Sequence, residues 1–122
     1  MEQKYQILAV DDDQELLNLL MSELSTAGFK VTQANDGDEA IARVQKKRFD
    51  LVILDIKMPK VNGIETLKYI KKHFPATKVI MLTAFADLQN ALESKRNGAE
   101  GFLDKPCDID ELITLMNRIL TT

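Results

Sequence analysis

The chain has 122 residues, a formal net charge of −3 at pH 7 and an apolar fraction of 45%. This length and this balance are typical of one globular domain, which we expect to span residues 1–122. Acidic and basic residues are mixed along the chain, so we expect no direct nucleic acid binding by this domain. Apolar runs of about four residues are too short to span a bilayer, so we expect no membrane association.

The cysteine content and the first residues bear on the compartment. Cys107 is the single cysteine in the sequence, which excludes an internal disulfide and suits a reducing environment. The segment that begins at Met1 has no apolar signal region. We therefore expect a cytoplasmic location, with Cys107 as a small structural residue.

The first elements in chain order are a strand at residues 6–10 and a helix at 14–27. Asp13 directly precedes the helix and is expected to cap it. Four leucines recur in the helix at helical spacing, namely Leu16, Leu17, Leu20 and Leu24. Gly28 supplies a stop, and the weaker apolar alternation at 30–34 predicts a strand at a sheet edge.

The middle of the chain continues the alternation. Asp36 and Glu39 have the spacing of a capping box at the start of a second helix. Residues 51–54 are all apolar, as expected of a strand covered by helices on both faces. The pattern at 64–74 predicts a third helix, which ends before Pro75.

The last third of the chain repeats the same order. We expect strands at residues 79–82 and 101–103, with a helix at 87–97 between them. Asp108 and Glu111 form a second possible capping box for the final helix. Five strands alternating with five helices predict an α/β fold, a doubly wound parallel sheet with helices on both faces.

Polar residues follow the predicted strands at the edge where such sheets bind ligands. Asp11 and Asp12 follow the first strand, Asp55 the third, Thr83 the fourth and Lys105 the fifth. Two carboxylates about 4 Å apart repel each other by roughly 4 kcal/mol at an effective dielectric of 20, so such a cluster raises a pKa or recruits a cation. Hard oxygen ligands suit Mg²⁺, for which Mn²⁺ can substitute.

This set of groups suggests a chemistry. A carboxylate beside Mg²⁺ can attack phosphorus and form an acyl phosphate. The phosphoryl oxygens then need positive charge and hydrogen-bond donors, which Lys105 and Thr83 can supply. High-energy mixed anhydrides of this kind suit transient signals better than storage.

Four motifs occur in register along the chain, namely Val10-Asp11-Asp12, Asp55-Ile56-Lys57-Met58-Pro59 with Gly63 downstream, Thr83-Ala84, and Lys105-Pro106. Together these motifs resemble those of the response regulator receiver domains of two-component signalling. The resemblance covers essentially the whole chain and is strongest to stand-alone receivers of the sporulation phosphorelay and chemotaxis types. It implies a flavodoxin-like fold with strand order 2-1-3-4-5.

The resemblance implies a role for each matching position. Asp55 is the expected phosphoacceptor. The expected metal ligands are Asp11, Asp12, Asp55 and the backbone carbonyl of Lys57. The expected phosphoryl-binding and switch residues are Thr83, Lys105 and Phe102. Phe102 departs from a Tyr or His at this place because its ring tip cannot hydrogen-bond. The resemblance also implies a cis Lys105–Pro106 peptide bond.

The same resemblance implies the partners. The phosphoryl donor is expected to be the phosphohistidine of a histidine kinase or phosphotransfer protein. The output is expected to pass to a downstream target protein or to a C-terminal output domain outside this chain. We do not expect a multiple-turnover enzyme. The alternative is a Mg²⁺-dependent phosphatase with an aspartate nucleophile, because Asp11 and Asp13 form an Asp-x-Asp pattern.

Overall fold

The structure is a computed structural model that describes residues 4–58, 62–83, 88–105 and 108–121. Within these ranges strands and helices alternate along the chain. Their bounds are β1 Gln6–Val10, α1 Gln14–Thr26, β2 Lys30–Ala34, α2 Gly37–Lys46, β3 Leu51–Asp55, α3 Gly63–His73, β4 Lys78–Thr83, α4 Leu88–Arg96, β5 Gly101–Asp104 and α5 Ile109–Leu120.

The strands form one parallel sheet in the order β2-β1-β3-β4-β5, which confirms the predicted fold class and strand order. Strand order reverses between β1 and β3, because the chain leaves β1 toward one edge and returns at β3 to continue toward the other. The carboxyl ends of these two central strands therefore meet at the switch point, where ligands of doubly wound sheets bind.

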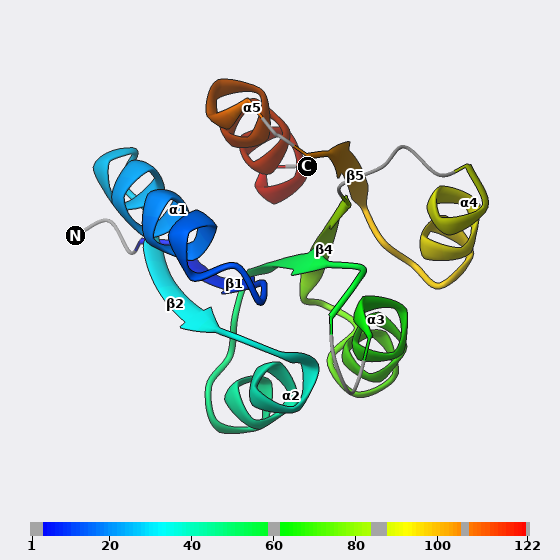
Figure 1. The fold of residues 1–122 in the computed structure, drawn as a ribbon. Coiled ribbons are helices and arrows are strands. Elements are labelled where there is room, and N and C mark those ends of the chain that lie inside the picture. Colours follow the sequence, from blue (N-terminus) through cyan, green and yellow to red (C-terminus); the bar gives the residue numbers. More distant parts are fainter. Residues whose placement is uncertain (1–3, 59–61, 84–87, 106–107, 122) are drawn as a thin grey trace.

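Helices cover both faces of the sheet (Figure 1), with α1 and α5 on one side and α2, α3 and α4 on the other. Successive strand residues point to opposite faces. In β1, Ile7 and Ala9 belong to the buried cluster with α1 and α5, whereas Leu8 and Val10 belong to the cluster with α2 and α3. Both clusters are apolar, so the polar chemistry is confined to the two ends of the strands.

Side chains cap the helices at the ends that face the site. Asp13 accepts hydrogen bonds from the backbone N–H of Glu15 and Leu16, which confirms its predicted role. Asp36 accepts from the N–H of Glu39 as predicted. The Glu39 carboxylate, however, accepts from the N–H of Asn35, one residue before the expected position. The loop before α2 is thus held by two side chains.

The last predicted helix start is also confirmed. Asp108 accepts hydrogen bonds from the backbone N–H groups of Asp110 and Glu111. Three predicted features involve residues outside the described ranges. They are Ala84 of the Thr83-Ala84 motif, the cis Lys105–Pro106 bond and Cys107.

Two central strands are longer than their apolar runs predicted. β3 continues to Asp55 because this residue still pairs with Leu82, and β4 continues to Thr83, which pairs with Asp104. Asp11, Asp12 and Lys105 directly follow β1 and β5, whereas Asp55 and Thr83 belong to the sheet itself. The backbones of Asp55 and Thr83 are held by ladder hydrogen bonds rather than by loops.

Gly63 begins α3 and lies against the end of β3. Its N–H donates to the Ile56 carbonyl over 2.8 Å. A Cβ atom at this position would lie 2.1 Å from the Asp55 carbonyl oxygen and 2.7 Å from the Ile56 Cα. Both neighbours are backbone atoms and cannot turn aside. The close approach of α3 to the strand end therefore requires glycine.

We predict that Gly63→Ala destabilises the protein by about 3 kcal/mol, because the added methyl group must push the backbone of the strand end away. Gly28→Ala is the comparison: Gly28 has φ +98° and open space around it, so only the left-handed backbone penalty of about 1 kcal/mol applies. Urea unfolding of both variants measures the difference. Equal losses in the two variants would contradict the tight contact at Gly63.

Candidate functional site

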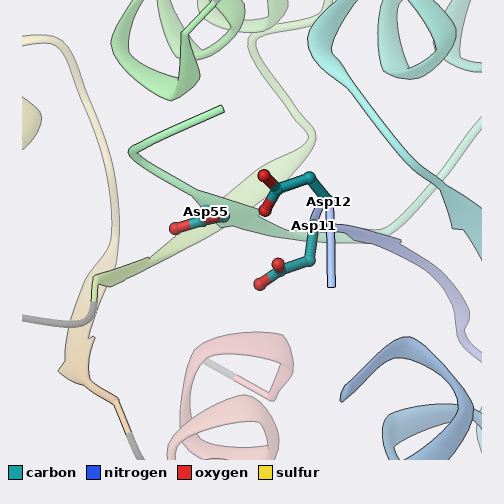
Figure 2. A group of neighbouring side chains, drawn as sticks. All are labelled: Asp11, Asp12 and Asp55. Atoms are coloured by element: carbon teal, nitrogen blue, oxygen red, sulfur yellow. The ribbon is translucent and has the colours of Figure 1, made fainter. Parts of the chain in front are cut away.

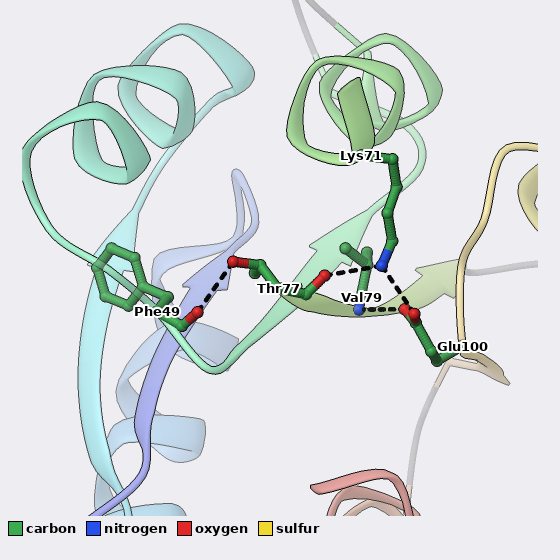
Figure 3. Close-up of polar contacts among 5 residues, drawn as sticks. All are labelled: Phe49, Lys71, Thr77, Val79 and Glu100. Atoms are coloured by element: carbon green, nitrogen blue, oxygen red, sulfur yellow. Dashed lines mark hydrogen bonds and ion pairs between the residues drawn. The ribbon is translucent and has the colours of Figure 1, made fainter. Parts of the chain in front are cut away.

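Three carboxylates lie together at the switch point of the sheet. One oxygen from each of Asp11, Asp12 and Asp55 lies within 4.8 Å of the other two. Figure 2 shows the three side chains extending from the ends of β1 and β3 toward the same region. Asp11 and Asp55 are buried, with exposed fractions of 1% and 4%, whereas Asp12 is exposed. The sequence placed these acids correctly at one sheet edge.

Lys105 provides the positive charge at the cluster. Its ammonium nitrogen lies 2.6 Å from Asp11 Oδ2 and 3.6 Å from Asp55 Oδ2. The other Asp11 oxygen accepts a hydrogen bond from the Asp13 backbone N–H. The sequence pattern predicted Lys105 as a phosphoryl-binding group but did not reveal that Asp11 is its nearer partner here.

The environment raises the pKa of Asp55 from 3.8 to about 6. Burial has the largest effect, and the negative charge of Asp11 adds to it. The positive charge of Lys105 and a hydrogen bond from the Lys57 backbone act in the opposite direction. Asp55 is therefore a carboxylate that the protein solvates poorly, although it stays ionised at neutral pH.

The pKa of Lys105 is raised above its ordinary value. Burial lowers it, but the hydrogen bond to Asp11 and the charges of Asp55 and Asp11 outweigh that effect. Lys105 is thus held as a cation wherever the acids are ionised.

The acids fit a divalent metal ion. Three carboxylates and the Lys105 ammonium together have a formal net charge of −2. The oxygen atoms are hard ligands, and the exposed Asp12 leaves the site open to water, as Mg²⁺ requires. Asp11, Asp12 and Asp55 could hold such an ion. The metal-binding role of the Lys57 carbonyl stays a prediction.

Two further predicted residues lie on neighbouring strands. Thr83 ends β4 and is buried, with 1% of its surface exposed. Phe102 pairs with Met81, is half-buried and packs against the cluster shared with α2 and α3. Strand alternation places the Thr83 and Phe102 side chains on the same face of the sheet. Their switch roles stay predictions.

A hollow of about 640 Å³ opens beside the acids, and sequence patterns did not reveal it. Asp12 and Lys57 line it at the strand ends, and Lys68 of α3 and Glu93 of α4 also line it. Residues from two helices meet there only because α3 and α4 cover the same face (Figure 1). The exposed side of the acid cluster is therefore accessible to a reactant.

The sequence matches the response regulator receiver domain over residues 7–117. The chain belongs to this receiver family. It is 40% identical to the transcriptional regulatory protein ZraR of Klebsiella oxytoca over 114 residues, which are 93% of this chain and 26% of that protein. It is 36% identical to the DNA-binding transcriptional regulator NtrC of Salmonella typhimurium over 94% of this chain and 24% of that one.

Solved receiver structures agree with the fold. The chemotaxis protein CheY4 of Vibrio cholerae has a TM-score of 0.90 and 35% identity, covering 95% of this receiver and 98% of that chain. A receiver from Methanospirillum hungatei has a TM-score of 0.94 and 32% identity, covering 98% and 95%. The receiver described here spans about a quarter of the length of the curated relatives. Among its described residues, the helices are too short or too polar to cross a membrane.

We predict that Asp55→Asn stabilises the metal-free protein near pH 7.5. A pKa raised from 3.8 to about 6 means that the folded state binds more protons between these values, so stability falls as pH rises through this window. The penalty is fully present above about pH 6 and amounts to about 3 kcal/mol at most. Urea unfolding in chelator should show the gain near pH 7.5 and little gain near pH 4.

A matched control for this prediction is Asp12→Asn, which removes the same charge at an exposed position. We expect it to change stability by less than Asp55→Asn. A loss of stability in Asp55→Asn near pH 7.5, or a gain that is equal at both pH values, would contradict the cost assigned to the buried charge.

Proposed function

We propose that Asp55 accepts a phosphoryl group from the phosphohistidine of a histidine kinase or phosphotransfer protein. The observation that carries the proposal is the cluster of Asp11, Asp12 and Asp55 with the Lys105 ammonium between two of them. Membership of the receiver family supports the assignment. The transfer is expected to use Mg²⁺, with Mn²⁺ as a possible substitute, held by the three aspartates and the Lys57 carbonyl.

The proposed reaction forms one bond and breaks another. An Asp55 carboxylate oxygen attacks the phosphorus, the phosphorus–nitrogen bond breaks, and the bonding electrons return to the histidine ring. Poor solvation of Asp55 favours its attack, because little hydration has to be removed. Lys105 lies 3.6 Å from Asp55 Oδ2, close enough to neutralise a phosphoryl oxygen there. Bound Mg²⁺ would neutralise further negative charge on the phosphoryl group.

The phosphoryl group would also act as the switch. We expect it to attract the Thr83 hydroxyl and so to vacate space into which Phe102 turns. This movement would alter the surface formed by α4, β5 and α5. Reversal of a two-state population from 1:99 to 99:1 requires about 5.5 kcal/mol of differential interaction free energy. Contacts of the phosphoryl dianion with a lysine, a hydroxyl and a metal ion can supply an energy of this size.

The proposed cellular role follows from the family. The receiver, taken as one domain over residues 1–122, would work in the cytoplasm and pass the signal to a target protein or an output domain. The transcriptional regulators ZraR and NtrC are much longer than this chain, which is compatible with an output domain in those relatives. We expect one phosphorylation per molecule with slow self-hydrolysis rather than enzymatic turnover.

We predict that acetyl phosphate with Mg²⁺ labels the wild-type protein once, at Asp55, and that hydroxylamine removes the label. Asp55→Asn should lose essentially all labelling, because the amide oxygen cannot form the acyl phosphate. Mass spectrometry of the intact protein measures the added phosphate. Glu23→Gln is a matched control, since it removes an exposed carboxylate of α1 that does not line the hollow beside the acids.

Two outcomes would contradict this function. Full labelling of Asp55→Asn at an acid-stable site would place the acceptor elsewhere. Multiple turnover of para-nitrophenyl phosphate that survives in Asp55→Asn and is lost in Asp11→Asn would favour the phosphatase alternative, whose nucleophile follows the first strand.

A further inference from the structure

Charge is segregated between the two ends of this domain. Acidic residues occupy the first turns of α1, α2, α3 and α5, and basic residues occupy the last turns of α2, α3, α4 and α5. All strands are parallel, so the helix starts lie at the edge with the acid cluster and the helix ends lie at the opposite edge. The edge opposite Asp55 is therefore rich in cations, although the net charge of the chain is −3.

A groove lies at that opposite edge, where β1, β2 and β3 begin. Its volume is about 750 Å³, and Lys4, Gln6, Lys30, Arg48 and Asp50 line it. We call it the lower groove. Three cations and one carboxylate line it, and the side chains of Lys4, Lys30 and Arg48 are exposed. An anionic ligand can therefore reach all three cations from solvent.

Backbone N–H groups at the lower groove already donate hydrogen bonds within the protein. The N–H of Gln6 donates to Asp50 Oδ2 over 2.8 Å, and the N–H of Asp50 donates to the Gln6 carbonyl. The N–H of Lys30 donates to the Tyr5 carbonyl. Compact phosphate sites rely on free backbone N–H groups at helix starts. The lower groove offers side-chain cations instead, which suits an extended anion with several separated charges.

The lower groove also contains acceptors. Gln6 Oε1 is buried and has no hydrogen-bond partner among the described residues. The Asp50 carboxylate adds a negative charge beside the three cations. Gln6 Oε1 can accept an N–H donor from a ligand, and the Asp50 carboxylate, which already accepts from the Gln6 N–H, repels further anions. Both groups disfavour a phosphodiester chain, which has only acceptors along its backbone. A polypeptide supplies one N–H per residue together with the carboxylates of its side chains.

We propose that the lower groove docks an acidic segment of a partner protein. Carboxylates of the segment pair with Arg48, Lys30 and Lys4, and its backbone or amide N–H groups face Gln6 and Asp50. The acidic edge around Asp55 repels the same segment, so the charge distribution steers it to the opposite edge. This docking does not depend on phosphorylation of Asp55, so it can be tested whether or not the proposed transfer occurs.

The test uses a blocked decaglutamate peptide titrated into ¹⁵N-labelled full chain at low salt. We expect amide shifts concentrated at the beginnings of β1, β2 and β3, and affinity that falls as sodium chloride is added. Lys30→Glu/Arg48→Glu should weaken binding by about tenfold or more. Inorganic polyphosphate and duplex DNA of equal charge concentration should bind more weakly than the peptide.

The matched control is Lys95→Glu/Arg96→Glu, which reverses two exposed cations at the end of α4. It should change affinity by less than about threefold. If the reversed groove variant does not fold, Lys30→Gln/Arg48→Gln carries the same test with a smaller expected loss. Equal losses in groove and control variants, shifts spread over the surface, or tighter binding of polyphosphate or DNA would each overturn the proposal.

Discussion

Two buried carboxylates beside a third, exposed one are the constraint on which the site depends. Asp11 and Asp55 are removed from water, and Lys105 compensates only part of their charge. The raised pKa of Asp55 has burial as its largest cause, and the negative charge of Asp11 adds to it. A divalent cation would remove that cost, and a phosphoryl group would restore a demand for positive charge. The same charge imbalance thus supports both the candidate metal site and the proposed acceptor role of Asp55.

The fold makes this costly arrangement possible. Two large apolar clusters cover the faces of the sheet, so the stability of the domain comes from layers that exclude the acids. Asp55 is held by strand pairing with Leu82, and the tight contact at Gly63 brings α3 against the strand end. Asp55 is therefore positioned by a paired strand, and Asp11 and Asp12 directly follow the paired strand β1.

Sequence patterns predicted the alternating strands and helices and the gathering of the three acids at one sheet edge, because apolar runs and strand-end residues are local features. The strand order followed from the family resemblance instead. Sequence patterns did not predict the nearer pairing of Lys105 with Asp11, which depends on side-chain positions across two strands. They also missed the tight contact at Gly63, which arises only when α3 packs on β3. Sequence patterns did not predict the lower groove, because its cations are far apart in the sequence and come together only where parallel strands begin side by side.

The most direct measurement is the thermal unfolding of the wild type and Asp12→Asn as Mg²⁺ is added near neutral pH. Asp12 is exposed, so the variant should fold while losing one ligand. We predict that the wild-type midpoint rises by several degrees once Mg²⁺ greatly exceeds its dissociation constant, since about 100-fold excess is worth roughly 3 kcal/mol. The variant should rise far less. A wild-type unfolding midpoint that does not change in millimolar Mg²⁺ would contradict the candidate metal site. Equal shifts of the midpoint in the wild type and in Asp12→Asn would contradict it as well.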